Sequence, residues 1–227
     1  MRNDRNYLRR NYRDKEVIPS LYLGNRQLTP GLVDSITING FLTIYQQTNT
    51  NGILLERRFY PDSVQHYGFE TIRIINLRDS SIQLRTAPNI SAEARLGSTG
   101  DLITFMMTDE PNPKSISIAS GGTYDLDILF GGQPDNHQTL RLRAASPHAK
   151  SAKDQWERFI KVAQDHLRLE TPNPVYNTMI NLAKIRGTES IFDSKLGLVH
   201  SPGGERYYCG FWANDQAEYI NPFFPYL

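Results

Sequence analysis

Hydrophobic and polar residues alternate with a period of two over much of the first 145 residues, as in half-buried β-strands. Residues 124–130 are the clearest example, with two aspartates between apolar neighbours. Further strands are predicted over residues 36–44, 53–60, 69–77, 102–107, 115–119 and 140–142. Asn-Gly pairs at residues 39–40 and 51–52 predict tight hairpin turns. Because no helical pattern separates these strands, the sequence predicts an antiparallel β-sandwich and not a doubly wound parallel sheet.

The hydrophobic period changes to that of an α-helix near Ser146 and Pro147. One helical stripe holds Trp156, Phe159, Ile160, Ala163 and Leu167. This stripe predicts a helix over residues 151–169, with Trp156 as a packing residue.

A second helix is predicted after the proline-rich boundary at residues 171–174. Asn173 has the side chain of an N-cap, Pro174 suits the first helical position, and Gly187 is an expected end. Residues 193–208 are expected to form a loop, and residues 212–220 a third helix before Pro222.

These patterns divide the chain into four parts. We expect a flexible basic N-terminus over residues 1–16, a β-sandwich over 17–148, a linker helix over 149–172, and the start of a helical domain over 173–227. The chain ends in an aromatic run that contains Phe223, Phe224 and Tyr226. Such a run normally packs against something, so we expect the chain to be part of a longer protein, or to self-associate.

Composition narrows the function classes. With 39% hydrophobic residues, 22% charged residues and a net charge of +1, the chain is globular and has no excess charge to bind nucleic acid or a membrane surface. The one cysteine, Cys209, excludes an internal disulfide framework, and the five histidines lack metal-ligand spacing, so no metal or other cofactor is expected. Since no secretory signal or membrane span is present, we expect a soluble protein, in the cytoplasm unless a missing N-terminal segment carries a signal.

The stretch over residues 200–219 holds the densest chemistry of the chain. It combines three carboxylates, an arginine, a histidine and five aromatic residues with several glycines. Aromatic faces cover the apolar side of a sugar ring, while carboxylates and guanidinium groups bond its hydroxyls. Hydrolysis of a glycosidic bond also needs a pair of carboxylic groups. The alternative is an aromatic domain junction with solvated acids, and composition alone leaves both open.

The order of elements and the motif in this stretch resemble a known superfamily. Gly204, Glu205 and Arg206 precede a Gly-Phe-Trp-Ala-Asn-Asp run over residues 210–215. Together with a sandwich and a linker helix, this is similar to the six-hairpin, or (α/α)6-barrel, glycosidases, and within them to the α-L-rhamnosidases. Gly204 stands where that family usually has an arginine, and His200 where it usually has an aspartate.

The resemblance implies a fold, a site and a reaction. The fold would be mainly β with α: an antiparallel β-sandwich, a linker helix and the first helices of an incomplete (α/α) toroid. A barrel of twelve helices needs on the order of 190 residues, more than remain here. The implied catalytic residues are Glu205, as general acid, and Asp215. The implied sugar-binding residues are Arg206, Tyr208, Trp212 and Glu218.

The function implied is therefore part of a glycoside hydrolase that acts on an oligosaccharide or glycoside, inactive alone if its second carboxylate lies in the missing barrel. A second hypothesis is a carbohydrate-binding module without catalysis. A third is a β-sandwich that binds another protein and no sugar.

Overall fold

The computed structural model describes residues 17–64, 67–87, 90–97, 100–108, 114–134, 146–189, 191–194 and 197–200, and six single positions after residue 200. The chain divides into two compact units. One unit is Asn6–Trp156, and the other is Glu157–Leu227 with Met1–Arg5. Each is described by itself below.

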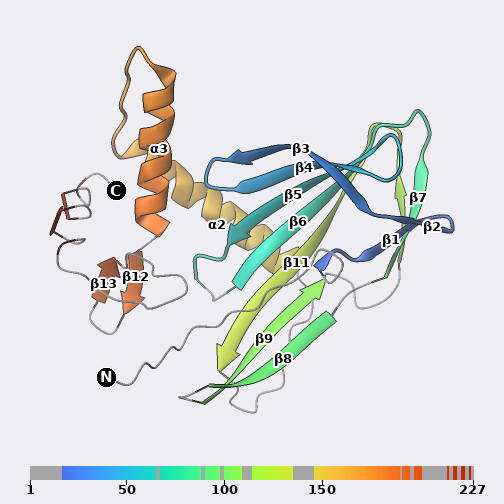
Figure 1. Ribbon diagram of the computed structural model, residues 1–227, viewed down its shortest axis with the longest axis horizontal. Helices are drawn as coiled ribbons and strands as arrows, with labels where there is room; N and C mark the ends of the chain where they lie inside the picture. Colours follow the sequence, from blue (N-terminus) through green and yellow to red (C-terminus); the bar gives the residue numbers. More distant parts are fainter. Residues whose placement is uncertain are drawn as a thin grey trace. The chain divides into compact units, whose positions relative to one another are not determined.

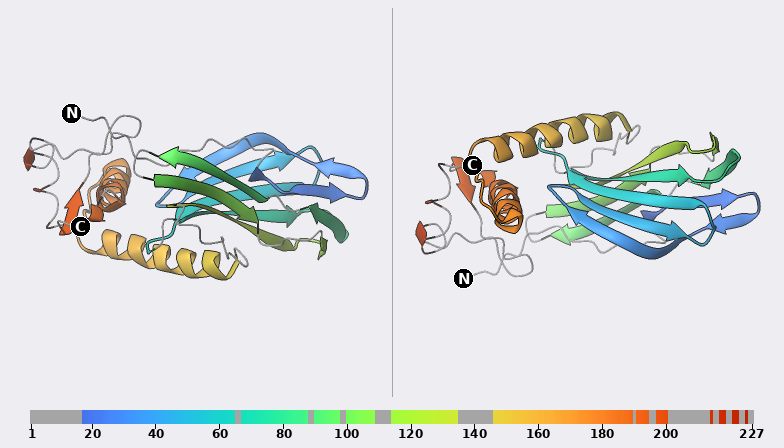
Figure 2. Two further views of the ribbon diagram at one scale, coloured as in Figure 1. Left: turned by 90° about the horizontal axis from the view of Figure 1, so that it is seen from below. Right: turned by 90° about the horizontal axis from the view of Figure 1, so that it is seen from above.

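The first unit contains two antiparallel sheets (Figures 1 and 2). The larger sheet has seven strands, in the spatial order β3 (Pro30–Ile38), β4 (Leu42–Thr48), β5 (Ile53–Pro61), β6 (Tyr67–Asn76), β11 (Thr123–Pro134), β9 (Gly100–Thr108) and β8 (Ile90–Gly97). The smaller sheet has the order β10 (Lys114–Ile118), β7 (Ile82–Ala87), β1 (Ser20–Leu23) and β2 (Arg26–Leu28). The predicted fold class, an antiparallel sandwich followed by helices, is confirmed.

The core lies between the two sheets and consists of branched aliphatic side chains. The small sheet contributes Leu21, Leu28, Ile82, Leu84, Ile116 and Ile118, and the large sheet contributes Ile53, Leu55, Ile72, Ile74, Leu126 and Ile128. On each strand that contributes two of them, these residues are two apart, so one face of that strand is buried. The four-stranded sheet covers the central strands β5, β6 and β11 of the larger sheet.

Both Asn-Gly pairs form the predicted hairpin turns. Gly40 connects β3 to β4 and Gly52 connects β4 to β5, each with a positive φ, 92° and 78°. Only glycine adopts this backbone conformation at little cost. At Gly52 a Cβ would also come within 2.8 Å of the Arg78 side chain.

A buried ion pair lies on the inner face of the large sheet. Arg57 on β5 and Glu70 on β6 are 5% and 0% exposed, and Arg57 Nε donates to Glu70 Oε1 at 2.5 Å. Gln46 on β4 accepts from Arg57 at 3.4 Å. These bonds connect side chains of three neighbouring strands, β4, β5 and β6. Removing one member of the ion pair would leave a buried charge uncompensated.

Helix α2 (Ser146–Asp165) begins at the predicted change of period, five residues before the expected start at 151. Its N-terminal half buries Ala149, Ala152 and Trp156 within the first unit. The Trp156 indole donates to the Gly40 carbonyl at 2.9 Å, and the Tyr60 hydroxyl donates to the Ala149 carbonyl at 3.3 Å. Trp156 is therefore the packing residue that the helical stripe predicted.

The second unit contains helix α3 (Pro174–Glu189) and a short hairpin, β12 (Ile191–Ser194) and β13 (Gly197–His200). The predicted N-cap is confirmed, because Asn173 Oδ1 accepts from the backbone amide of Val175 at 3.0 Å. The hairpin replaces the start of the loop that the sequence predicted from residue 193. A tight turn is available there because Gly197 has a φ of 93°.

Two predicted elements lie outside the described residues for the most part. The strand predicted over residues 140–142 lies entirely outside the described residues. Of the predicted third helix, only Asn214, Ala217 and Glu218 are described, and each has a helical backbone. Among the described helices, none is both long and apolar enough to cross a membrane.

Candidate functional site

The predicted carboxylate pair falls in a part of the chain outside the described residues. Glu205, Arg206, Tyr208, Trp212 and Asp215 all belong to it, as do the aromatic residues 223, 224 and 226. Glu218 is described and is exposed to solvent. A common face for Glu205 and Asp215 therefore stays a prediction.

The hairpin β12–β13 leads directly into that stretch. His200, its last residue, is 6% exposed and lies opposite Ile191 in the strand register. The backbone that enters the acid-rich and aromatic-rich stretch therefore starts from a buried side chain in a paired strand.

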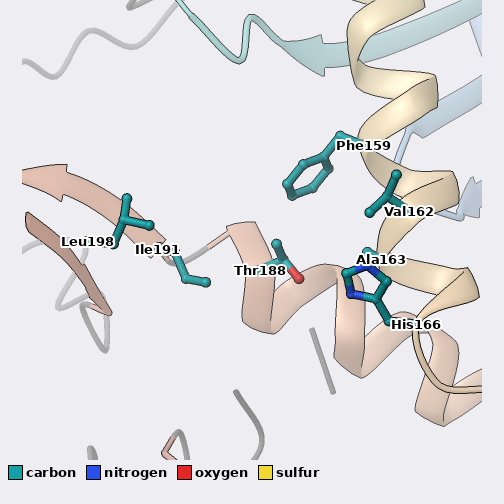
Figure 3. Close-up of a pocket in the computed structure, with 7 residues that line it drawn as sticks. All are labelled: Phe159, Val162, Ala163, His166, Thr188, Ile191 and Leu198. Carbon is teal, nitrogen blue, oxygen red and sulfur yellow. The ribbon is translucent and has the colours of Figure 1, made fainter. Parts of the chain in front are cut away.

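An open pocket of about 490 Å³ lies beside this hairpin, inside the second unit (Figure 3). Its walls come from α2, the end of α3 and both hairpin strands, and consist of Phe159, Val162, Ala163, His166, Thr188, Ile191 and Leu198. The volume falls in the usual range for small-molecule sites.

The chemistry of the pocket is mainly apolar. Its polar side chains among the described residues are the His166 imidazole and the Thr188 hydroxyl, and the hydroxyl donates to the Lys184 carbonyl at 2.7 Å. None of the described lining residues is a carboxylic acid. The described walls can therefore hold an apolar group but contain no acid–base pair for glycoside hydrolysis.

Lys184 fixes the end of helix α2 close to this pocket. Its side chain is fully buried, and Nζ donates to the Gln164 carbonyl at 2.7 Å and to the Leu167 carbonyl. These carbonyls belong to the last turn of α2 and its exit, where helix carbonyls lack partners inside the helix. Burial lowers the pKa of Lys184, while the nearby Asp165 carboxylate opposes that shift.

Glu189, the last residue of α3, carries a perturbed carboxyl group. Burial raises its pKa, and the ion pair with Arg186 opposes the increase. A carboxyl group that holds its proton at higher pH is the type that serves as a general acid. Sequence reasoning passed over Glu189 because a single glutamate at a helix end is common, and only burial distinguishes it.

A polar network covers part of the outer face of the large sheet. The Tyr60 hydroxyl lies 2.9 Å from the Thr71 hydroxyl, which donates to Asp127 at 2.6 Å. Burial raises the pKa of Tyr60 far above its usual range, so the phenol stays protonated. Arg73 forms a two-point ion pair with Asp125 at 2.8 and 2.9 Å.

This network is a structural feature and not a ligand site. The depression beside it is only about 10 Å³, scarcely room for one water molecule, and its charged groups include the paired Arg73, Glu56 and Arg58. Within the described part of the chain, no group of three or more histidine, cysteine, aspartate or glutamate side chains could hold a metal ion.

Comparison with known proteins gives little further guidance. No known protein family matches the sequence. No curated protein is similar to the chain at a significant level. Among solved structures, one similar chain is a putative kojibiose phosphorylase from human microbiome, with 10% sequence identity and a TM-score of 0.39. The match covers 77% of this chain and 28% of that one, and at this TM-score the similarity transfers no property to the present chain.

Proposed function

We propose that this chain is the sandwich and linker part of a glycoside hydrolase that acts on a carbohydrate. Glu205 would be its general acid, Asp215 its assisting carboxylate, and Arg206, Tyr208, Trp212 and Glu218 its sugar contacts. The proposal rests on the residue types of the stretch over 200–219 and on its resemblance to the six-hairpin glycosidases, the α-L-rhamnosidases in particular.

The observation that supports it most is the order of elements before that stretch. A confirmed sandwich is followed by α2, whose first half packs on the sandwich, then by the capped helix α3 and the hairpin that ends at the buried His200. In the proposed enzyme, the two carboxylates would follow this paired, buried strand end. General acid catalysis needs an acid held in a fixed position as much as it needs the right pKa.

The second candidate is a carbohydrate-binding module without hydrolysis. It is favoured by the described walls of the pocket, which lack a carboxylic acid. The same aromatic residues would then stack on sugar rings, and Glu205 would only bond hydroxyl groups.

The test compares hydrolysis and binding by the longest form of the protein expressed from its coding sequence. Hydrolysis is measured on a panel of aryl glycosides that includes an aryl α-L-rhamnoside, and binding is measured by calorimetry on the matching free sugars. The variants are Glu205→Gln and Trp212→Ala. Glu170→Gln, an exposed acid between α2 and α3, is the matched control.

We expect Glu205→Gln to lower hydrolysis by about 100-fold or more, as lost general acid catalysis would, with sugar binding little changed. Trp212→Ala should weaken binding, and Glu170→Gln should change neither. Sugar binding without hydrolysis would favour the binding module. If Glu205→Gln hydrolyses its substrate as fast as the unchanged protein, Glu205 is not the general acid. A protein that neither hydrolyses nor binds any sugar would contradict both candidates.

A further inference from the structure

Strand β3 leaves the large sheet with an exposed, apolar edge. β3 is the first strand in the sheet order, with β4 as its one neighbour among the described residues (Figure 1). Every residue of β3 after Pro30 is exposed, and Ile36 and Ile38 are 56% and 61% exposed. Natural proteins usually protect such edges with charges, prolines or bulges, because an open edge can pair with another strand.

The two halves of β3 differ in this protection. Pairing with β4 is irregular between Pro30 and Ser35, where two shifts of register occur. From Ser35 to Ile38 the pairing is regular, one residue opposite one residue. The half from 35 to 38 also contains no charge and no proline, so it is the part able to accept another strand.

The exposed isoleucines lie on the same face as the sandwich core. Ile36 pairs with Ile44, which pairs with Arg57, which in turn pairs with the core residue Ile72. Residues directly opposite in a sheet point to the same side. The inner face thus extends beyond the area that the small sheet covers, across the buried Arg57, and ends at the apolar side chains of Ile36 and Ile38.

We propose that β3 is a dimerisation edge that pairs antiparallel with β3 of a second copy of this chain, around a two-fold axis at Thr37. In this register Ile36 lies opposite Ile38 of the other copy, and Thr37 lies opposite Thr37. Apolar side chains then meet on the inner face, and two threonines meet on the outer face, a favourable cross-strand pair.

The sequence of β3 argues for a second copy over a strand of other chemistry. A two-fold axis requires a self-complementary strand, and residues 36–38 read Ile-Thr-Ile, the same in both directions. The one charge of β3, Asp34, falls outside the paired stretch and accepts a hydrogen bond from Gln47 at 2.9 Å. In this register, therefore, no like charges face each other. A register centred on Asp34 would place the two Asp34 carboxylates opposite each other.

The dimer should be weak. An edge of about five residues, with the isoleucines beside it, is near the lower size limit for a specific interface. We expect a dissociation constant in the micromolar range and a mass that rises with concentration toward about twice 25.9 kDa. This association rests on β3 and is independent of the proposed function.

The first measurement is sedimentation of the full chain over a range of concentrations. Ile36→Lys should weaken dimerisation by more than tenfold, because two lysines would be brought onto one apolar edge. The control is Leu77→Lys, which places a lysine at another exposed apolar position of the same unit and should leave the dimer intact. Circular dichroism checks that both variants stay folded.

The second measurement tests the register by disulfide cross-linking in a Cys209→Ser background. Thr37→Cys should form a disulfide between copies, since opposite residues bring their Cβ atoms to about 4.5–5.5 Å. Ser35→Cys should not, because the two Ser35 positions would be four residues, about 13 Å, apart along the strand.

A chain that stays monomeric at several hundred micromolar would overturn the proposal. So would a dimer that survives Ile36→Lys, or one abolished by Phe223→Ser and Phe224→Ser alone, which would assign association to the aromatic end. Equal cross-linking of Thr37→Cys and Ser35→Cys would overturn the register and with it the two-fold pairing.

Discussion

The two units of the chain stabilise their elements by different means. In the sandwich, two sheets bury a continuous aliphatic core, and nearly every central strand contributes two or more fully buried side chains. In the second unit, α3 buries only Lys184 and Ile185, while Val175 and Met179 are both 59% exposed. Hydrophobic burial supplies most of the stability of a folded domain. Because α3 has little of it, this helix depends more on its N-cap and on polar bonds. The comparison separates a unit with its own core from one whose described residues provide little core.

The largest expected effect is in the sandwich, at the buried ion pair. Glu70→Leu should lower the free energy of unfolding by about 3–5 kcal/mol, because Arg57 would remain charged and buried without its carboxylate. Chemical denaturation measures this loss. Replacing both residues with leucine should restore most of the stability.

The exposed pair on the other face of the sheet is the control for that prediction. Arg73→Leu removes the ion pair with Asp125, and the loss should stay below about 1 kcal/mol because solvent screens both groups. An equal loss from Glu70→Leu and Arg73→Leu would mean that the Arg57–Glu70 pair is not the desolvated contact described above.

A smaller effect is expected in the second unit, at Lys184. Lys184→Met should cost about 1–3 kcal/mol, because the Gln164 and Leu167 carbonyls would lose their buried donor. Lys161→Met is the matched control: Lys161 is 75% exposed and pairs with Asp165 on the surface. Thermal unfolding followed by helix circular dichroism compares the two. If both variants lose the same stability, burial of Lys184 has no special role.

The smallest effect is a dependence on pH at Asp165. Hydrogen bonds from Lys161 and Arg168 lower its pKa to about 2 from an ordinary value of 3.8. A lowered folded pKa gives stability that is present above pH 4 and is lost as the pH falls toward 2. Asp165→Asn should therefore lower Tm slightly at pH 6, by no more than about 2 °C, and not at pH 2. A larger loss at pH 2 than at pH 6 would reverse the assigned sign.

Local patterns gave most of the fold. Period-two alternation located β11, the Asn-Gly pairs located two hairpin turns, and Asn173 located the start of α3, because each depends on neighbouring residues alone. The early start of α2 escaped prediction because Ala149 and Ala152 are weak hydrophobic signals whose burial comes from tertiary contacts.

The candidate site was less predictable, for physical reasons. The predicted pair, Glu205 and Asp215, is ten residues apart, and nothing local fixes where two loop carboxylates point. The apolar pocket brings together Phe159, Thr188 and Leu198, which are far apart in the chain and share no motif. The buried Arg57–Glu70 pair was equally hidden, because charges within strands usually indicate an exposed face.

The difference between the two units is tested most directly by hydrogen exchange of the full chain, followed by mass spectrometry. Amides of β5, β6 and β11 should exchange only through global unfolding, while amides of α3 should exchange at least about 100-fold faster through local opening. Peptides from α3 that exchange as slowly as those of β6 would contradict the account, because they would show that both units unfold as one.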